Sequence, residues 1–238
     1  MPVSLGRSDP GQPAYVTLVA GQHLSNLRVG LIRSARLEGR IQGEGGQVLA
    51  GVPIQLIRDD SSTPGVRQRM DSIAQASTAA DGSYRLSAFV PGRYILIAGY
   101  PRALNGAAAQ SFAARIEVPN TDLQTLDFSL DSKGGHAVRG KVSIDGTSGL
   151  PADVHFSIRA ASPSATTGSG DENVTSAYDP NSGRFEIPGL YPGLYEIYLS
   201  SQIPMRCAGA TAVVLHDDAG PLDLILRECQ RLEIRATP

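Results

Sequence analysis

The chain has four histidines, and histidine is the side chain used most often for acid–base chemistry and zinc binding near neutral pH. They are His23, His136, His155 and His216. None stands in the H-x-x-E, H-E-x-x-H or H-x-H spacing that would bring two ligands to one zinc ion. A histidine-based metal site is therefore not expected. His155 alternates with Val154 and Phe156 and is predicted on the outward side of a strand.

Two segments imitate ligand-binding loops without completing them. Residues 135–141 read GHAVRGK, like the start of a phosphate-binding loop, but Val142 stands where Ser or Thr must bind magnesium. Asp179, Asn181 and Gly183 have the spacing of part of a calcium loop, but the acidic residue that closes such a loop is missing. We therefore expect no metal ion at either place, and a turn held by side-chain bonds to the backbone at Asp179.

The sequence also lacks the residue patterns that nucleophilic catalysis by serine requires. A serine nucleophile needs a general base and an oxyanion pocket. The chain contains no G-x-S-x-G sequence and no Ser/His/Asp grouping on well-defined turns. The sequence therefore predicts no catalytic residue, no cofactor and a protein that is not an enzyme.

Tyrosines are the remaining candidates for ligand contact, because sugar binding relies on exposed aromatic faces with a few polar groups. Tyr178 and Tyr191 lie in predicted turns and are the candidate binding residues. Tyr84, Tyr94 and Tyr195 fall at inward-facing positions and are expected in a core. After the turn at Pro91-Gly92, Tyr94, Leu96 and Ala98 are expected to alternate inward against Arg93, Ile95 and Ile97. The absence of Trp weakens the case for a sugar ligand.

The only cysteines are Cys207 and Cys229, and they form no C-x-x-C pair. Two interpretations stay open. They are two separate thiols, or they form one disulfide, because both lie near strands that are expected to be neighbours and an exported protein would favour the bridge.

Charge and hydropathy exclude two classes of partner. The formal net charge of the 238 residues is −2 and both signs are interspersed, so no basic stripe is available to neutralise nucleic-acid phosphates. The longest apolar runs, such as residues 94–98, are far shorter than the roughly 20 residues of a membrane-spanning helix. Residues 1–10 lack the apolar core of a signal peptide. We expect no nucleic-acid binding, no membrane insertion and no export signal in this chain.

The elements that position these residues follow a repeat. The stretch DGSYRLSAFVPGRY at residues 81–94 recurs as NSGRFEIPGLYPGLY at residues 181–195. Tyr84 corresponds to Phe185 and Tyr94 to Tyr195, each pair 101 positions apart. Each copy is predicted to be a turn, a strand, a second turn and a strand. Asp81-Gly82 is a favoured signal for a two-residue hairpin.

Alternation of apolar and polar residues predicts further strands around each copy. A pair of half-buried strands recurs three times, at residues 15–32, 115–130 and 212–228, and each pair leads into a further strand, the first at residues 35–42. Second strands are predicted at 49–57 and 154–158. The polar loop at 59–71 is expected in solvent, and the segment 66–78 fits either a short helix or an edge strand.

Length and composition suit an all-β protein. The chain can hold two domains of about 100 residues, and 26 Gly, 16 Pro and no Trp favour short strands joined by turns. We predict two tandem seven-stranded Greek-key β-sandwiches. The predicted units are a linker and strand pair at 1–33, a first domain at 34–132, a second at 133–230 and a truncated strand at 231–238.

The order of these patterns resembles the carboxypeptidase regulatory-like domain, a transthyretin-like β-sandwich. The resemblance rests on Gly39, Gly51, Ile54, Asp81, Gly82, Tyr84, Pro91, Gly92 and Tyr94 in the first copy and on Gly140, Val154, Gly183, Phe185, Pro192, Gly193 and Tyr195 in the second. It departs from the family pattern at residues 179–182, where the turn is longer, and at Ile234, where glycine is expected. Residues 16–22 are also similar to the link between consecutive domains in bacterial arrays of this family.

The resemblance implies a non-catalytic extracytoplasmic module that acts as a spacer or protein-interaction domain within a longer array. The array would lie in the periplasm, on the cell surface or in a secreted protein, with neighbouring repeats of the same chain and a protein or glycan as partner. Two alternatives remain. The similarity of this fold to starch-binding domains implies a carbohydrate-binding module, and the occurrence of such domains attached to peptidases implies an accessory domain of a peptidase.

Overall fold

The computed structural model describes residues 20–23, 25, 34–61, 68, 70–100, 110–120, 123–161, 172–173, 176–202 and 205–228. Apart from one short 3-10 turn at Glu44–Gly46, the regular structure of these residues is entirely strand, which confirms the all-β prediction. A search of these residues for a helix long and apolar enough to cross a bilayer found none. Cys229, the strand predicted from residue 231 and nearly all of the strand pair at 15–32 lie outside the described residues.

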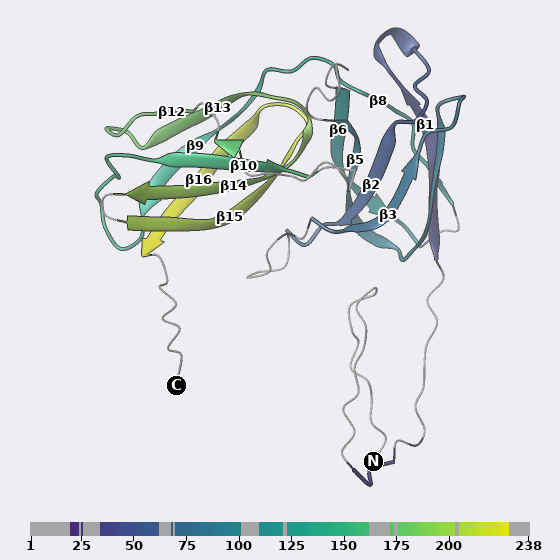
Figure 1. Cartoon of the computed structure of the whole chain (residues 1–238), viewed down its shortest axis with the longest axis horizontal. Helices are drawn as coiled ribbons and strands as arrows, with labels where there is room; N and C mark the ends of the chain where they lie inside the picture. Colours follow the sequence, from purple (N-terminus) through teal and green to yellow (C-terminus); the bar gives the residue numbers. More distant parts are fainter. Residues whose placement is uncertain are drawn as a thin grey trace, which may run out of the picture.

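The first half of the molecule consists of two four-stranded sheets (Figure 1). One sheet has the order β4-β1-β7, with β8 also paired to β1, and the other has the order β3-β2-β5-β6. The strands are β1 (Ala35–Gln42), β2 (Pro53–Arg58), β3 (Ser72–Ser77), β4 (Ser83–Phe89), β5 (Gly92–Tyr100), β6 (Gln110–Val118), β7 (Gln124–Thr125) and β8 (Phe128–Ser129). Within the segment 66–78, residues 72–77 form the predicted edge strand, β3.

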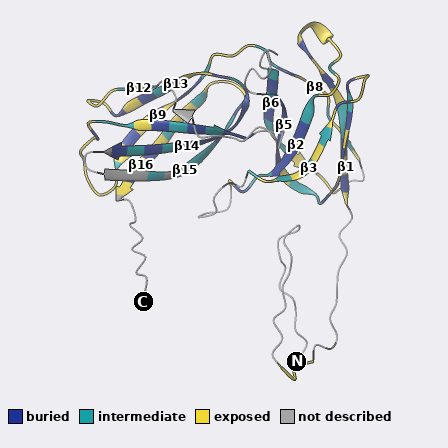
Figure 2. Cartoon of the chain, in the orientation of Figure 1, coloured by how far each residue is buried: buried dark blue, intermediate teal, exposed yellow. Residues whose placement is uncertain are grey.

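The core of the first half lies between its two sheets (Figure 2). Tyr94, Leu96 and Ala98 of β5 alternate inward and are fully buried, as the sequence predicted. They pack with Leu37 of β1 and Leu86 of β4 in one hydrophobic cluster. Burial of apolar surface at these alternating positions is what holds the two sheets together.

The second half forms one eight-stranded sheet with the order β11-β10-β14-β15-β16-β9-β13-β12. Its strands are β9 (His136–Ile144), β10 (His155–Ala160), β11 (Glu172–Asn173), β12 (Ala177–Tyr178), β13 (Arg184–Leu190), β14 (Gly193–Gln202), β15 (Met205–Leu215) and β16 (Ala219–Glu228). β16 pairs with both β15 and β9, so it joins layers that stay separate in the first half. Phe156, Phe185 and Tyr195 lie in the single core cluster of this half.

Two local predictions were wrong. The Asp81-Gly82 turn is not a two-residue hairpin, because the Ala79 N–H donates to the Ser83 carbonyl at 2.8 Å and leaves Ala80, Asp81 and Gly82 in the loop. The strands on either side belong to different sheets, since β3 pairs with β2 and β4 pairs with β1. The turn is therefore a corner between sheets.

The loop at residues 59–71 is not wholly solvated. Asp60 and Gln68 are buried, although their side chains are polar. The Gln68 side chain accepts a hydrogen bond from the Asp60 N–H at 2.9 Å and donates one to the Arg58 carbonyl at 2.6 Å. These bonds satisfy the buried groups and tie the loop back onto the end of β2. The described residues form eight strands in each half, two of which have only two residues, so the predicted number of seven strands per half stays a prediction.

Candidate functional site

The structure does not bring the two candidate tyrosines together. Tyr178 lies on the edge strand β12, where it pairs with Phe185, and not in the turn predicted for it. Its hydroxyl donates to the Pro151 carbonyl at 2.8 Å. Burial raises the pKa of this hydroxyl, with smaller contributions from the carboxylates of Asp179 and Asp153. The hydroxyl is thus engaged within the fold, and only the ring borders an open hollow.

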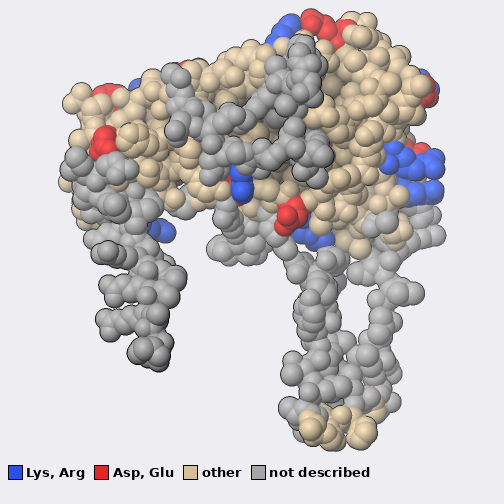
Figure 3. All heavy atoms as spheres, viewed as in Figure 1, with Lys and Arg blue, Asp and Glu red and all other residues tan. Residues whose placement is uncertain are grey.

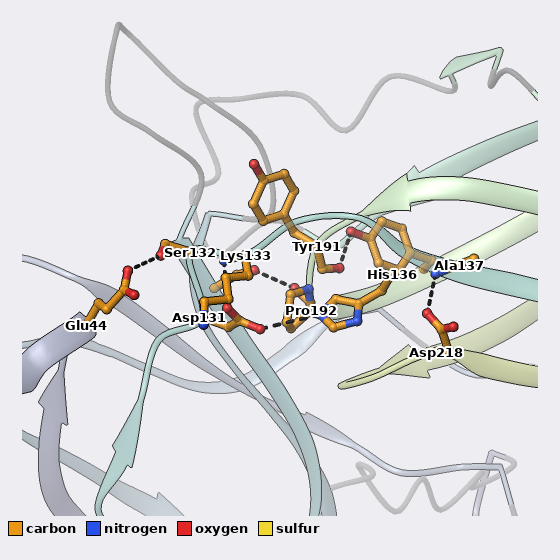
Figure 4. Close-up of polar contacts among 11 residues, drawn as sticks. Glu44, Asp131, Ser132, Lys133, His136, Ala137, Tyr191, Pro192 and Asp218 are labelled. Carbon is orange, nitrogen blue, oxygen red and sulfur yellow. Dashed lines mark hydrogen bonds and ion pairs between the residues drawn. The ribbon is translucent and has the colours of Figure 1, made fainter.

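Tyr191 lies at the junction between the two halves (Figure 4). Its ring covers the backbone of Gly134, where an added side-chain carbon would lie 2.5 Å from Cζ of the ring. Its carbonyl accepts the hydroxyl of Tyr195 at 2.7 Å. Tyr191 is therefore a packing residue of the connection between the halves, far in the fold from Tyr178.

Each half has an open hollow at the same place on its outer surface. The hollow of the first half has a volume of about 660 Å³ and is bordered by Gly39, Tyr84 and Asp127. The hollow of the second half has about 1000 Å³ and is bordered by Gly140, Phe185 and Asp223 at the corresponding positions. Because both copies show the hollow while its side chains differ, we attribute it to the shared geometry of the strands.

A cross-strand ion pair at these hollows is conserved in position but reversed in charge. Glu38 of β1 lies opposite Arg85 of β4, and their side chains are 2.5 Å apart. In the second half Arg139 of β9 lies opposite Glu186 of β13, at 2.8 Å. Such exchange is expected of a pair that stabilises neighbouring strands, because either order of charges gives the same attraction.

The remaining predicted positions behave as structural residues. Asp179 accepts hydrogen bonds from the Asn181 N–H at 3.0 Å and the Ser182 hydroxyl at 2.5 Å, which lower the pKa of its carboxyl. His155 is exposed and lies 3.6 Å from Asp153. Among the described residues no group of three acidic, His or Cys side chains could hold a metal ion. β15 and β16 are neighbours, but the side chain of Cys207 and all of Cys229 lie outside the described part, so the disulfide stays a prediction.

The most extensive feature outside the two cores is an apolar junction between the halves. Ile57 of β2 and Ile95 and Ile97 of β5 point away from the first core and are nonetheless almost completely buried. Leu194 and Ala161 of the second half lie against them and are equally buried. Met70, Ala212 and Val214 complete the cluster.

Polar contacts surround this apolar cluster. The hydroxyl of Ser111, on β6, is fully buried and donates to the Pro192 carbonyl of the second half at 2.6 Å. The ring of His216 meets the ring of Phe112 edge-on at 5.4 Å. A buried hydroxyl that has its partner costs little to bury, and it fixes the two surfaces in one register.

The connecting segment is held at both ends (Figure 4). The backbone of Asp131 exchanges two hydrogen bonds with Ser111, at 2.9 and 3.0 Å. The Asp131 carboxylate accepts from the Lys133 N–H at 2.6 Å and lies 3.4 Å from His136. The Ser132 hydroxyl donates to Glu44 at 2.9 Å. The short connection is therefore anchored to the first half before it enters β9.

The sequence contained a signal for this junction that the strand prediction did not use. Alternation correctly placed Ile95 and Ile97 on the face opposite Tyr94, where a solvated sheet would carry polar residues. Strands that are apolar on both faces are typical of sheets covered on both sides. The run of apolar residues at 94–98 thus indicates that a second layer covers β5.

On the face seen in Figure 3, charged side chains of both signs are scattered among the described residues and form no basic stripe. The charged groups with displaced pKa values are held by hydrogen bonds or ion pairs. Arg139, for example, contacts both Asp218 and Glu186, and these bonds raise its pKa.

No protein-family model matches this chain, and no curated protein matches it. Among solved structures it is similar to the shaft pilin SpaA of Lactobacillus rhamnosus GG, with 11% identity, a TM-score of 0.30 and coverage of 84% of this chain and 100% of that chain. It is also similar to GBS52, the minor pilin of Streptococcus agalactiae, with 15% identity, a TM-score of 0.30 and coverage of 85% and 100%.

A streptococcal ancillary pilin shows 13% identity and a TM-score of 0.30, and the Bacillus anthracis TIE protein shows 15% identity and a TM-score of 0.29. This chain spans 63% of the former and 34% of the latter. TM-scores at this level carry no argument about a shared function. The function has to be inferred from the residues of this chain.

Proposed function

We propose that this chain is a non-catalytic, extracytoplasmic module whose two halves are separate β-sandwich domains locked into one rigid spacer. The observation that carries the proposal is the apolar junction, in which Ile57, Ile95 and Ile97 are buried against Leu194. Two cores with separate clusters support the division into domains near residue 132. The mechanism is mechanical, because a rigid pair holds whatever is attached at its two ends at a fixed separation.

The stability of the lock follows from the chemistry of the junction. Fully burying one isoleucine contributes about 1.5–3 kcal/mol, so several of them outweigh the loss of freedom of two domains that are already tethered. The buried hydrogen bond between the Ser111 hydroxyl and the Pro192 carbonyl fixes the relative orientation of the two halves. The resemblance to the carboxypeptidase regulatory-like domain supports a place in a longer array on or outside a bacterial cell.

Small-angle X-ray scattering of the full chain tests the rigidity. The wild type should fit one compact arrangement of the two halves. Ile97→Lys places a charge in the apolar junction and should increase the radius of gyration while each half keeps its β-sheet circular dichroism. Ile225→Lys is the matched control, because Ile225 is 43% exposed and lies outside the junction. An unchanged scattering profile for Ile97→Lys would contradict the proposal.

The carbohydrate-binding alternative has less support. Tyr178 borders one hollow and Tyr191 packs on Gly134, so the two rings form no common platform. A glycan-array screen of the wild type, with Tyr178→Ala as the control for any ligand found, distinguishes this alternative from a spacer. No observation on the described residues favours an accessory role for a peptidase.

A further inference from the structure

The junction is asymmetric with respect to the repeat. Equivalent positions in the two halves follow from the strand registers, in which Tyr94 of β5 corresponds to Tyr195 of β14. Ile95 then corresponds to Glu196, Ile97 to Tyr198 and Ile57 to Arg159. The surface of the first half formed by Ile57, Ile95 and Ile97 is called the socket.

The surface of the second half that is equivalent to the socket is polar at all three positions, Arg159, Glu196 and Tyr198. Arg159 and Glu196 form an ion pair, and the hydroxyl of Tyr198 donates to the same carboxylate at 2.9 Å. Glu196 is already almost completely buried, whereas about a third of the Arg159 side chain is exposed. A repeat that docked here as the second half docks on the first would bury the rest of the Arg159 side chain. Burying charges costs several kcal/mol for each ion unless partners replace water. The second half therefore lacks the surface that accepts an apolar neighbour.

The opposite side of the contact shows the same asymmetry. The second half presents to the socket a surface called the knob, which consists of Ala161, Leu194, Ala212 and Val214. The Ala161 N–H donates to the Leu194 carbonyl, and the Asp59 N–H donates to the Arg93 carbonyl. Because Leu194 and Arg93 are equivalent, Ala161 corresponds to Asp59. Register in β6 and β15 makes Arg115 the counterpart of Ala212 and Glu117 the counterpart of Val214.

The surface of the first half that is equivalent to the knob consists of Asp59, Arg93, Arg115 and Glu117 and is thus charged at every position. Arg115 lies 3.4 Å from Asp59, and Arg93 lies directly opposite Glu117. Arg93, Arg115 and Glu117 are exposed. Inward-facing positions are apolar or aromatic in both copies, but the copies differ in chemistry at these seven positions. Apolar residues occur only on the two surfaces that meet.

We propose that these seven positions determine which repeats dock on one another. A socket of three isoleucines accepts a repeat of this fold whose knob has small or apolar residues at the positions of Ala161, Leu194, Ala212 and Val214. Charged residues at the same positions mark an end that makes no such contact. In a longer array the rigid unit would then be a pair of unlike repeats, joined to other repeats by a different contact. This inference rests on the proposed rigid pair.

The test uses three variants of the full chain. Variant X is Leu194→Arg with Val214→Glu, which introduces two of the four charged residues of the first half at their equivalent positions and leaves the isoleucine socket uncovered. Variant Y is Asp59→Ala, Arg93→Leu, Arg115→Ala and Glu117→Val, which gives the first half an apolar knob. Variant Z is Ile95→Glu with Ile97→Tyr, which opens the junction by making the socket polar.

Sedimentation velocity and small-angle scattering give the readouts. X and Z alone should be extended, and Y alone should stay as compact as the wild type. Mixing X with Y should produce a complex of twice the chain mass of 25.0 kDa, because the new knob of Y binds the free socket of X. Mixing Z with Y should produce no complex, since only Ile57 of the apolar socket remains in Z. Circular dichroism and thermal melting confirm folding, and Leu194→Arg alone replaces X if the double variant does not fold.

The outcomes separate this inference from the proposed function. If X opens but does not capture Y, the seven positions do not determine docking, while the rigid junction stands. Capture of Y by Z as well as X would also overturn the inference, because the contact would not depend on the socket. If X stays as compact as the wild type, both the inference and the role of the junction as a lock are wrong.

Discussion

Two tyrosine hydroxyls make the same contact in both halves. The Tyr94 hydroxyl donates to the Val90 carbonyl at 2.5 Å, and the Tyr195 hydroxyl donates to the Tyr191 carbonyl at 2.7 Å. Each bond joins the start of a buried strand to the turn before it. Burial raises the pKa of the Tyr94 hydroxyl, so it stays protonated and able to donate. These residues serve the fold, as their inward positions in the repeat predicted.

Asp218 is the carboxylate with the most evident structural role at the surface. It accepts from the Ala137 N–H at 2.8 Å and pairs with Arg139, and these bonds lower the pKa of its carboxyl. A carboxyl with a lowered folded-state pKa stabilises the protein at pH values above its ordinary pKa of about 3.9, and this contribution is lost as the pH falls through the folded value.

We therefore expect Asp218→Asn to lower the melting temperature at pH 7 and to have little effect near pH 2. Added salt should shrink the difference at pH 7, because the carboxylate is exposed. Asp217→Asn carries the same charge change at the neighbouring exposed position and is the control. Melting curves across this pH range check the prediction, and an effect of Asp218→Asn that persisted at pH 2 would contradict it.

At the scale of the elements, one glycine in each half allows two strands to approach. A side-chain carbon at Gly39 would lie 1.9 Å from the Leu126 carbonyl oxygen, and one at Gly140 would lie 2.0 Å from that of Leu222. No real side-chain carbon comes this close to backbone. The parallel strands β7 and β16 can therefore lie beside β1 and β9 only because these positions have no side chain.

Gly39→Ala should lower the free energy of unfolding by about 3 kcal/mol, since the backbone of Leu126 must move to admit the methyl group. Gly149→Ala is the control, because its nearest neighbour, the Thr147 hydroxyl, would lie at 3.6 Å, an ordinary contact. Chemical denaturation measures both. Equal stabilities of the two variants would mean that the strands tolerate a wider separation.

At the scale of the whole molecule, the junction should couple the unfolding of the two halves. Each half has its own core, but the cluster of Ile57, Ile95, Ile97 and Leu194 belongs to both. Loss of either half would expose the buried face of the other. The coupling free energy is of the order of several buried isoleucines.

The wild type should therefore unfold in a single calorimetric transition. Ile97→Ala removes part of the shared cluster, at a cost of about 2–4 kcal/mol, and should separate the transition into two. Leu96→Ala is the matched control on the same strand, because Leu96 points into the first core alone. Leu96→Ala should lower the stability of the first half but should not weaken the junction between the halves. Two resolved transitions in the wild type would show that the halves are independent.

Much of the fold could be predicted from the sequence because strand patterns are local. The first strand was predicted at residues 35–42, and β1 spans Ala35–Gln42. The inward positions of Tyr84, Tyr94 and Tyr195 are confirmed by their burial. The hairpin at Asp81-Gly82 was wrong, because the partner of a strand is set by distant residues. β3 pairs along its whole length with β2, and this pairing sends β4 to the other sheet.

At the candidate site, too, local patterns could be predicted from the sequence and contacts between distant residues could not. The sequence predicted a turn held by the Asp179 side chain, and its hydrogen bonds with Ser182 and Asn181 confirm that turn. The sequence by itself determined the all-β class, the repeat and the faces on which Tyr94, Ile95 and Ile97 lie, because side-chain alternation depends only on neighbouring residues. Only the tertiary structure decided that Ile95 and Ile97 are covered, and by Leu194, because contact between two folded surfaces depends on how whole sheets are placed in space.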